Sequence, residues 1–317
     1  MNLIPLSLQD ADGIKKLLFI WNSASHPDYL LNERFLAYNA LPFSGETIGG
    51  RLAILNGESV GFVLTCCVTD DSAMMLGWVS AIAVCPAAQR RGIGSSLLDW
   101  AEDWLKMQGG KRIRVGGNLR PFAPGLPYAM HENLLFFEKR GYQPPVGQPY
   151  EYDIARSLKD YQSLYTKPIH ADLAPMQSGQ ESLLLDFLKR EYPGRWEFEA
   201  REFVKNGVRP QDYLLLRVNN KVEGFCRITL EDSERPIERF YPQRLPRPWG
   251  QFGPLGLSKA VRGQGLGGYL IDATALHMQS LGVNGCVIDW TTLVDLYGKF
   301  GFNLYNQYVS LYKNIGA

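Results

Sequence analysis

The sequence predicts an α/β protein (α+β, with a mixed sheet) built as two tandem domains of the same fold. Three segments occur twice in the same order along its 317 residues: a hairpin, a glycine loop that opens a helix, and an aromatic segment with a late glycine. One such match could arise by chance, but three in register with similar spacing indicate a duplication. Strand and helix signals alternate within each half, which favours this fold class.

The composition is that of a globular protein: 45% of the residues are hydrophobic and 21% are charged. The formal net charge of +1 gives no reason to expect nucleic acid or an anionic membrane as a partner. The opening residues, MNLIPLSLQD, do not resemble a signal peptide, and no run of 18 apolar residues occurs. We therefore expect a cytoplasmic protein that binds neither nucleic acid nor membrane.

Metal and disulfide chemistry are not indicated by the cysteines. There are five of them, an odd number, and no C-x-x-C occurs. We expect buried free thiols in a reducing compartment and no metal.

The hairpin is the first repeated element. RLAILNGESVGFVLTCCV (51–68) has two apolar runs around Asn56-Gly57, a strong hairpin signal. DYLLLRVNNKVEGFCRITL (212–230) repeats the pattern around Asn219-Asn220. Each half then continues as strand, loop, helix, strand, helix and strand.

The glycine loop is the second repeated element. WVSAIAV (78–84) reads as an apolar strand, and Gly92-Ile93-Gly94 opens the amphipathic helix that follows it. A helix N-terminus offers free N–H groups and partial positive charge, and glycine lets an anion approach closely, so a diphosphate is the natural ligand. A dinucleotide fingerprint is excluded because GIGSSL lacks its third glycine and no suitable acidic residue follows GQGLGG. A Walker A loop is excluded because Gly-Lys-Ser/Thr is absent.

The aromatic segment is the third repeated element: FFEKRGY (136–142) and LYGKFGF (296–302). Each follows a short apolar run that reads as a buried strand, RIRVGG in the first half and GCVIDW in the second. The first half is 13 residues longer here, within GGNLRPFAPGLPYAMHENLL (116–135), and we expect this loop and SERPIERFYPQRLPRPWG (233–250) to shape an acceptor site. The predicted domains are residues 1–158 and 167–317.

These segments resemble a known family. IAVCPAAQRRGIGSSLL (82–98) and GPLGLSKAVRGQGLGGYLI (253–271) resemble the Q/R-x-x-G-x-G/A loop of the GCN5-related N-acetyltransferase (GNAT) superfamily, and the aromatic segments look like its later F-Y-x-K-x-G-F segment. The resemblance covers nearly the whole chain as two GNAT domains, a layout similar to that of mycothiol synthase. It implies an acyl-CoA-dependent N-acyltransferase that moves acetyl from acetyl-CoA directly to a primary amine of a small molecule or peptide, without a metal. The alternative is a non-catalytic acyl-CoA-binding sensor or scaffold, and the chain would be a monomer with an internal pseudo-dimer, or a homodimer.

The resemblance also assigns acyl-CoA contacts. The strand residues would pair with the pantetheine amides, and the loop residues would hold the diphosphate through main-chain N–H groups. The residues so assigned are Ile82, Val84, Gln89, Arg90, Arg91, Gly92, Ile93, Gly94 and Ser95 in the first half, and Leu255, Leu257, Arg262, Gly263, Gln264, Gly265, Leu266, Gly267 and Gly268 in the second. The first domain would be structural, a second CoA site, or both.

One difference between the halves points to a catalytic residue. Tyr297 stands where the family often has a tyrosine that donates a proton to the leaving thiolate, and the first half has Phe137 there. Proton transfer from tyrosine to such a thiolate is uphill by only about 2 kcal/mol. The resemblance therefore implies catalysis in the second domain, with Tyr142, Tyr128 or His131 as possible substitutes in the first. Asp289 is a candidate base or substrate-orienting residue; a structural role for it, and a water chain as base, remain open.

Overall fold

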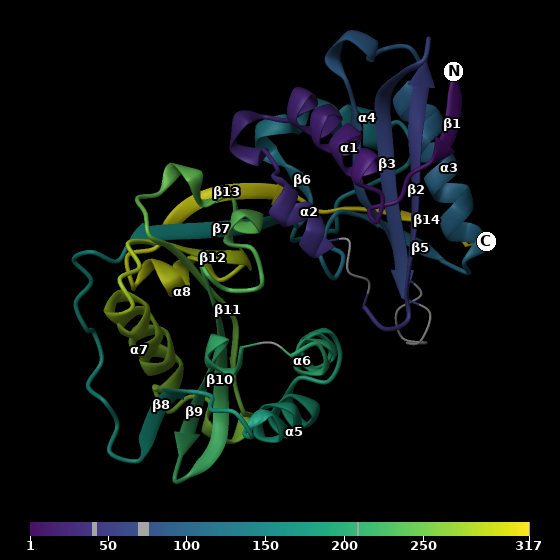
Figure 1. Ribbon diagram of the computed structural model, residues 1–317. Coiled ribbons are helices and arrows are strands. Elements are labelled where there is room, and N and C mark those ends of the chain that lie inside the picture. Colours follow the sequence, from purple (N-terminus) through teal and green to yellow (C-terminus); the bar gives the residue numbers. More distant parts are fainter. Residues whose placement is uncertain (40–42, 69–75, 208, 317) are drawn as a thin grey trace. The chain divides into compact units, whose positions relative to one another are not determined.

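The computed structural model describes residues 1–39, 43–68, 76–207 and 209–316. They form two compact units (Figure 1). Unit 1 comprises Met1–Tyr152 and Asn306–Ala317, and unit 2 comprises Asp153–Tyr305. The mixed sheets described below confirm the predicted fold class.

Unit 1 is built on a six-stranded sheet of order β1-β2-β3-β4-β5-β14. All its neighbouring strands are antiparallel except β4 and β5, which are parallel. The elements of this unit are β1 (Asn2–Pro5), α1 (Ala11–Ala24), α2 (Glu33–Asn39), β2 (Glu46–Leu55), β3 (Glu58–Val68), β4 (Leu76–Val84), α3 (Ile93–Met107), β5 (Arg112–Val115), β6 (Leu126–Pro127), α4 (Leu134–Glu138) and β14 (Leu311–Asn314). The hairpin expected around Asn56-Gly57 is β2–β3.

Two long helices cover opposite faces of this sheet. Trp21 of α1 lies against Phe62 of β3, with ring centroids 6.3 Å apart. The next residue of β3, Val63, belongs to the core cluster that the apolar side of α3 forms with the strands. Because successive residues of a strand point to opposite faces, α1 and α3 lie on different sides of the sheet.

Strands β4 and β5 separate partway along their length. They pair only from Leu76 with Arg112 to Val79 with Val115, so the described residues 80–84 have no partner in β5. The register between β3 and β4 also shifts there, because Leu64 faces Ala81 and Thr65 faces Val79. Ser80 is thus the extra residue of a β-bulge, which bends its strand and opens a gap beside it.

Unit 2 repeats the arrangement. Its elements are β8 (Ala171–Pro175), α5 (Glu181–Glu191), α6 (Arg195–Lys205), β9 (Tyr213–Val218), β10 (Lys221–Leu230), β11 (Trp249–Leu257), α7 (Leu266–Ser280), β12 (Gly285–Thr291) and α8 (Val294–Gly298). The parallel strands β11 and β12 pair only from Trp249 with Gly285 to Gln251 with Val287 and then separate. The second sheet has the order β6-β13-β7-β12-β11-β10-β9-β8, where β7 is Tyr150–Ser157 and β13 is Asn303–Val309.

The end of the chain belongs to the first sheet, which the sequence-based boundaries at 1–158 and 167–317 do not foresee. β14 pairs with β5, from Leu311 with Val115 to Asn314 with Arg112 (Figure 1). Conversely, β7 lies between β12 and β13 in the second sheet. The reason is packing: β5 has a free edge beyond β4, and Leu311 is fully buried in the core of unit 1 when β14 covers that edge.

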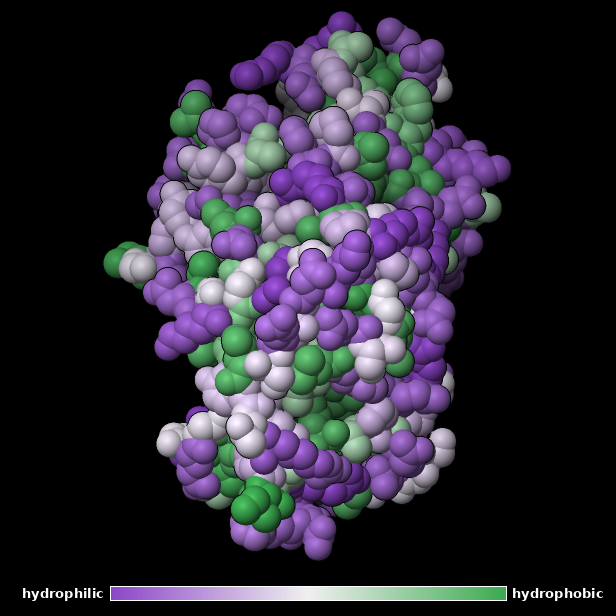
Figure 2. All heavy atoms as spheres, turned by 90° about the vertical axis from the view of Figure 1, so that its left-hand side faces the viewer, coloured by the Kyte–Doolittle hydropathy of each residue, from purple (hydrophilic) through white to green (hydrophobic). Residues whose placement is uncertain are grey.

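Two further expectations concern free cysteine thiols and membrane-spanning segments. All five cysteines are unpaired; four are buried and Cys85 is half-buried. In the part of the chain that the structure describes, no helix has the length and apolar character needed to cross a membrane. On the face drawn in Figure 2, hydrophobic side chains occur in small groups among hydrophilic ones, an ordinary pattern for a protein surface.

Candidate functional site

A cavity of about 910 Å³ lies in unit 1, where β4 and β5 separate. Its walls are residues 80–84 of β4, the glycine loop and the segment around α4. This volume is near the upper end of the range for small-molecule sites, which is about 300–1,000 Å³. The bulge at Ser80 and the short pairing of β4 with β5 therefore create a space large enough for a cofactor-sized ligand.

One wall of the cavity is a strand edge. Residues 80–84 have no partner in β5, so their outward N–H and C=O groups can pair with an extended ligand. Ile82 and Val84, which the sequence analysis assigned to this role, both line the cavity. The carbonyl of Val84 also accepts a hydrogen bond from Gln89 Nε2 at 3.0 Å, which fastens the glycine loop to the strand.

The glycine loop forms the end of the cavity that suits an anion. Gly92 is the N-cap of α3 and has a φ of +77°, a left-handed conformation that favours glycine. A side-chain atom added at Gly94 would lie 3.6 Å from Phe136, an ordinary van der Waals contact, so this position has room for a Cβ atom. Arg90 and Lys139 also line the cavity and add positive charge. Of the predicted loop residues 89–95, all but Arg91 line it.

The other end of the cavity is mostly apolar. Trp21 of α1 lies there with Phe122, which comes from the long loop that was expected to shape an acceptor site. Ser25, the C-cap of α1, also lines the cavity. Trp21 and Phe122 pack together with ring centroids 5.4 Å apart.

Ser80 is a polar side chain on the strand wall. Its hydroxyl lies 3.3 Å from Cys66 Sγ. Burial raises the pKa of the Cys66 thiol, and the charge of Glu46 adds to the effect, so the thiol is neutral and holds the hydroxyl in place. Ser80 is not predictable as a site residue from sequence, because a serine within an apolar strand is equally typical of a structural position.

The position equivalent to Tyr297 is apolar in this unit. Phe137 lines the cavity, and its ring meets Tyr142 edge-on at 5.6 Å. Tyr142 is fully buried, while Tyr128 and His131 stack on each other at 5.2 Å. None of these three is among the residues that line the cavity, so the structure does not place a substitute hydroxyl there.

Tyr297 and Asp289 lie in unit 2 and interact electrostatically. Tyr297, on α8, is 6% exposed and belongs to the hydrophobic core. Burial raises the pKa of its phenol, and the charges of Cys226 and Asp289 raise it further. Asp289 accepts a hydrogen bond from Gln251 Nε2 at 2.6 Å, and burial raises the pKa of its carboxyl. Both shifts favour the neutral forms, so the phenol is a weaker acid than an ordinary tyrosine.

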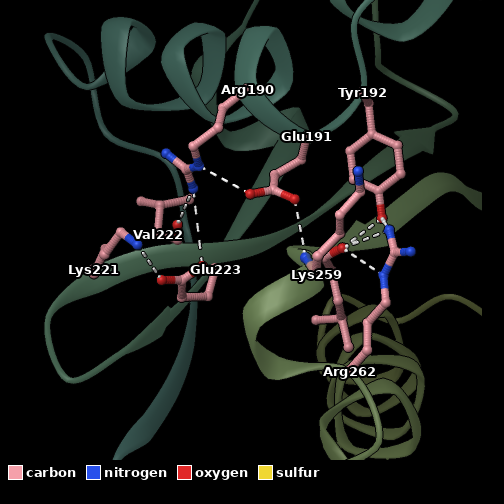
Figure 3. A network of polar contacts seen from close by, with 9 residues as sticks. Arg190, Glu191, Tyr192, Lys221, Val222, Glu223, Lys259 and Arg262 are labelled. Atoms are coloured by element: carbon pink, nitrogen blue, oxygen red, sulfur yellow. Dashed lines mark hydrogen bonds and ion pairs between the residues drawn. The ribbon is translucent and has the colours of Figure 1, made fainter.

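The glycine loop of unit 2 has the same backbone but different surroundings. Gly265 is the N-cap of α7 with a φ of +79°, as Gly92 is for α3. The strand carbonyl that precedes the loop, that of Leu257, accepts hydrogen bonds from the side chains of Tyr192 and Arg262 (Figure 3). The first turn of α7 lies against Tyr165 at Gly268. Side chains of the protein itself therefore occupy positions assigned by sequence to acyl-CoA.

Comparison with known proteins assigns a family to each half. An acetyltransferase (GNAT) domain model matches residues 49–144, and an acetyltransferase (GNAT) family model matches residues 182–302. Together the two matches cover about two thirds of the chain. No curated protein matches the sequence.

Solved structures of low sequence identity share the fold. The GCN5-related glucosamine N-acetyltransferase region of a fungal multi-domain GH3 beta-N-acetylglucosaminidase superimposes with a TM-score of 0.84 at 19% identity, over 98% of this chain and 38% of that one. A tandem GNAT protein from the clavulanic acid biosynthesis pathway has a TM-score of 0.72 at 12% identity, over 100% and 99% of the two chains. A GCN5-related N-acetyltransferase from Sphaerobacter thermophilus has a TM-score of 0.69 at 16% identity, over 99% and 97%. The chain thus spans less than half the length of the fungal protein and nearly all of the other two.

Proposed function

The chain belongs to the GCN5-related N-acetyltransferase family, and we propose that it transfers acetyl from acetyl-CoA directly to a primary amine of a small molecule or peptide, with acetyl-CoA in the cavity of unit 1. N-acetyltransferase activity follows from the two family domains. The placement in unit 1 rests on one observation: a cavity of about 910 Å³ joins the free strand edge to the glycine loop there.

The residues of the cavity fit the parts of acetyl-CoA in order. Free N–H groups in the first turn of α3 and the charge of Arg90 suit the diphosphate. The edge of β4 around Ile82 suits the amides of the pantetheine arm. The thioester would then lie near Ser80, where the bulge turns the strand, and the acceptor would lie against the apolar wall that Trp21 and Phe122 form together.

Transfer needs a neutral amine held against the thioester carbon. When bound, acetyl-CoA supplies an activated acyl group, so the contribution of the protein is positioning and exclusion of water. The apolar side chains around the far end of the cavity disfavour a charged ammonium, so the amine binds after giving its extra proton to solvent. When its nitrogen attacks the thioester carbon, the C–S bond breaks, and the departing CoA thiolate takes up the proton that the nitrogen loses. We propose that the hydroxyl of Ser80, fixed by Cys66, orients the amine.

Replacing Ser80 with alanine tests that role. We expect kcat to fall about two- to tenfold, because one hydrogen bond contributes about 0.5–1.5 kcal/mol, while the Kd for acetyl-CoA is unchanged. Ser80→Thr, which keeps the hydroxyl, should recover part of the loss. Steady-state kinetics and calorimetric titration measure both quantities; an unchanged kcat in Ser80→Ala would remove Ser80 from the site.

Replacing Tyr297 with phenylalanine tests which unit carries the chemistry. If acetyl-CoA reacts in unit 1, Tyr297→Phe should leave kcat within about twofold, since it removes one hydroxyl from the core of unit 2 and little volume. General acid catalysis contributes about 10²–10⁴-fold. A fall in kcat of that size, with an unchanged Kd for acetyl-CoA, would show that the reaction takes place in unit 2.

The proposed activity itself is tested with a panel of amines. The purified chain and acetyl-CoA are mixed with glucosamine, amino acids, and short peptides with a free N-terminus, and release of the free thiol is followed. Glucosamine is included because the fungal structural neighbour is described as a glucosamine N-acetyltransferase region. We expect thiol release that depends on one class of amine and is lost in a variant that cannot bind acetyl-CoA. Binding of acetyl-CoA with no amine-dependent release across the panel would favour a sensor or scaffold.

A further inference from the structure

Two serines line the cavity of unit 1 at positions where tyrosine side chains fill the space in unit 2. Ser25 is the C-cap of α1 and lines the cavity, whereas Tyr192 is the C-cap of α5, the equivalent helix. Ser95, the third residue of α3, also lines the cavity. Its equivalent on α7 is Gly268, which is covered by Tyr165.

Tyr192 packs against the end of β11, where an extended ligand would bind. Its hydroxyl donates a hydrogen bond of 2.6 Å to the carbonyl of Leu257, at the end of β11 (Figure 3). Its ring lies so close to Gly256 that any side chain there would collide with it. The ring is held in turn by the rings of Trp196 and Phe225, with centroids 4.9 and 6.1 Å away. The strand edge equivalent to residues 83–84 of unit 1 is therefore already filled.

Arg262 reinforces this arrangement from the glycine loop. Its guanidinium donates to the carbonyl of Leu257 at 3.2 and 3.3 Å and to the hydroxyl of Tyr192 at 3.1 Å (Figure 3). Gln89, the equivalent residue of unit 1, makes the same kind of contact with the carbonyl of Val84, so the bond from Arg262 to Tyr192 is the contact that distinguishes unit 2.

Ion pairs and hydrogen bonds fasten the end of α5 to the same loop. Glu191 accepts the backbone N–H of Lys259 at 2.9 Å and pairs with Arg190 at 2.9 Å (Figure 3). These contacts, the N–H of Lys259 first, lower the pKa of the Glu191 carboxyl and keep it charged. The residue before Tyr192 is therefore tied to the loop.

Tyr165 covers the helix N-terminus. Its ring stacks on Phe300 at 5.8 Å and occupies the space beside Gly268. Asp272 of α7 holds the surrounding segment, because its carboxylate accepts hydrogen bonds from the backbone N–H groups of Leu164 and Tyr165 at 2.9 and 3.3 Å. Tyr161 and Ser163 donate to the same carboxylate through their hydroxyls, at 2.7 and 2.9 Å.

We propose that Tyr165 and Tyr192 close the acyl-CoA groove of unit 2, so that the chain has one open acyl-CoA site and one latent site of the same fold. This inference rests on the proposed function, since it takes the groove of unit 1 as the acyl-CoA site. The ring of Tyr192 fills the space beside Gly256 on the strand, and Tyr165 fills the space beside Gly268 in the first turn of α7. Tyr192 stands at the position that Ser25 has in unit 1. Tyr165 lies beside Gly268, the position that Ser95 has in unit 1.

Calorimetric titration with acetyl-CoA tests the proposal in two backgrounds. The wild-type chain should bind one molecule. Gly94→Asp, which places a carboxylate in the groove of unit 1, should bind none, and adding Tyr165→Ser and Tyr192→Ser to it should restore binding of one molecule with at least a tenfold gain in affinity. Two molecules bound by the wild type, or no gain in a folded triple variant, overturns the proposal. A wild type that binds no acetyl-CoA contradicts the proposed function instead.

A reciprocal variant keeps the test valid if the triple variant does not fold. Ser25→Tyr installs in unit 1 the side chain found at the equivalent position of unit 2, and we expect it to weaken acetyl-CoA binding at least tenfold with circular dichroism unchanged. Phe19→Tyr, which puts the same side chain at an exposed position of α1 outside the cavity lining, is its matched control and should bind as the wild type does. Equal affinities of the folded Ser25→Tyr chain and the wild type overturn the proposal.

Discussion

Gly94→Asp is expected to reduce the affinity for acetyl-CoA by at least about 100-fold, or about 2.7 kcal/mol, and to abolish turnover at substrate concentrations that saturate the wild type. Gly94 is the second residue of α3 and faces the cavity, with its nearest neighbour, Phe136, 3.6 Å from where a side chain would begin. The new carboxylate would stand where the diphosphate is expected, and like charges brought together in this way cost several kcal/mol. Calorimetric titration gives the affinity directly.

The fold should tolerate this change. A carboxylate in the first turn of a helix interacts favourably with the helix dipole, and the added Cβ atom makes only ordinary van der Waals contacts. The matched control is Gly267→Asp at the equivalent position of α7, where the nearest atom, in Leu257, is 3.7 Å away. If acetyl-CoA binds only in unit 1, the control binds it as the wild type does. The opposite pattern, loss in Gly267→Asp alone, would place the acyl-CoA site in unit 2.

Leu311→Ala is expected to destabilise unit 1 by about 2–5 kcal/mol, the usual cost of truncating a buried leucine. Leu311 is fully buried and belongs to the core of unit 1, although it lies only six residues from the end of the chain. Its strand, β14, covers the edge of β5. Hydrogen exchange read by mass spectrometry should show faster exchange in α3 and β4.

Exchange in unit 2 serves as the internal comparison for this variant. The protection of α7 should be much less affected, because Leu311 contributes to the core of unit 1. Leu304→Ala, at a position on β13 that is 57% exposed, should change little in either unit. Loss of protection in α7 with none in α3 would assign the end of the chain to the second unit, as the sequence-based boundaries do.

The local parts of this fold were readable from sequence because each depends on adjacent residues. Asn56-Gly57 predicts the β2–β3 hairpin since few other pairs adopt that turn easily. Gly92 predicts the start of α3 since its φ of +77° disfavours most side chains. These signals, with their repeats, were sufficient for the fold class and for the family resemblance.

The sequence does not predict which sheet the last strand, β14, joins. Leu311 pairs with Val115, nearly two hundred residues earlier, and a four-residue strand with the sequence LYKN does not specify its partner. Only the packing of each core decides between the two edges, and no local pattern records it.

The choice between the units was also beyond the sequence. The sequence favours unit 2, because Tyr297 has a hydroxyl and Phe137 has none, and this expectation stands until Tyr297→Phe is measured. The proposal for unit 1 depends instead on the surroundings of each groove, which the sequence does not show. The state of each groove depends on Tyr192, which lies 65 positions before Leu257, and on Tyr165, which belongs to the segment that joins the repeats. Their effect appears only when the chain is folded.

A crystal structure of the chain with acetyl-CoA tests the central claim most directly. The account predicts one molecule in unit 1, with its diphosphate at the N–H groups of residues 93–95, its pantetheine arm along Ile82 and its thioester near Ser80. In the same crystal, Tyr192 should still donate its hydrogen bond to the carbonyl of Leu257. Acetyl-CoA along Leu255 and Leu257, with Tyr192 displaced and the cavity of unit 1 empty, would contradict it.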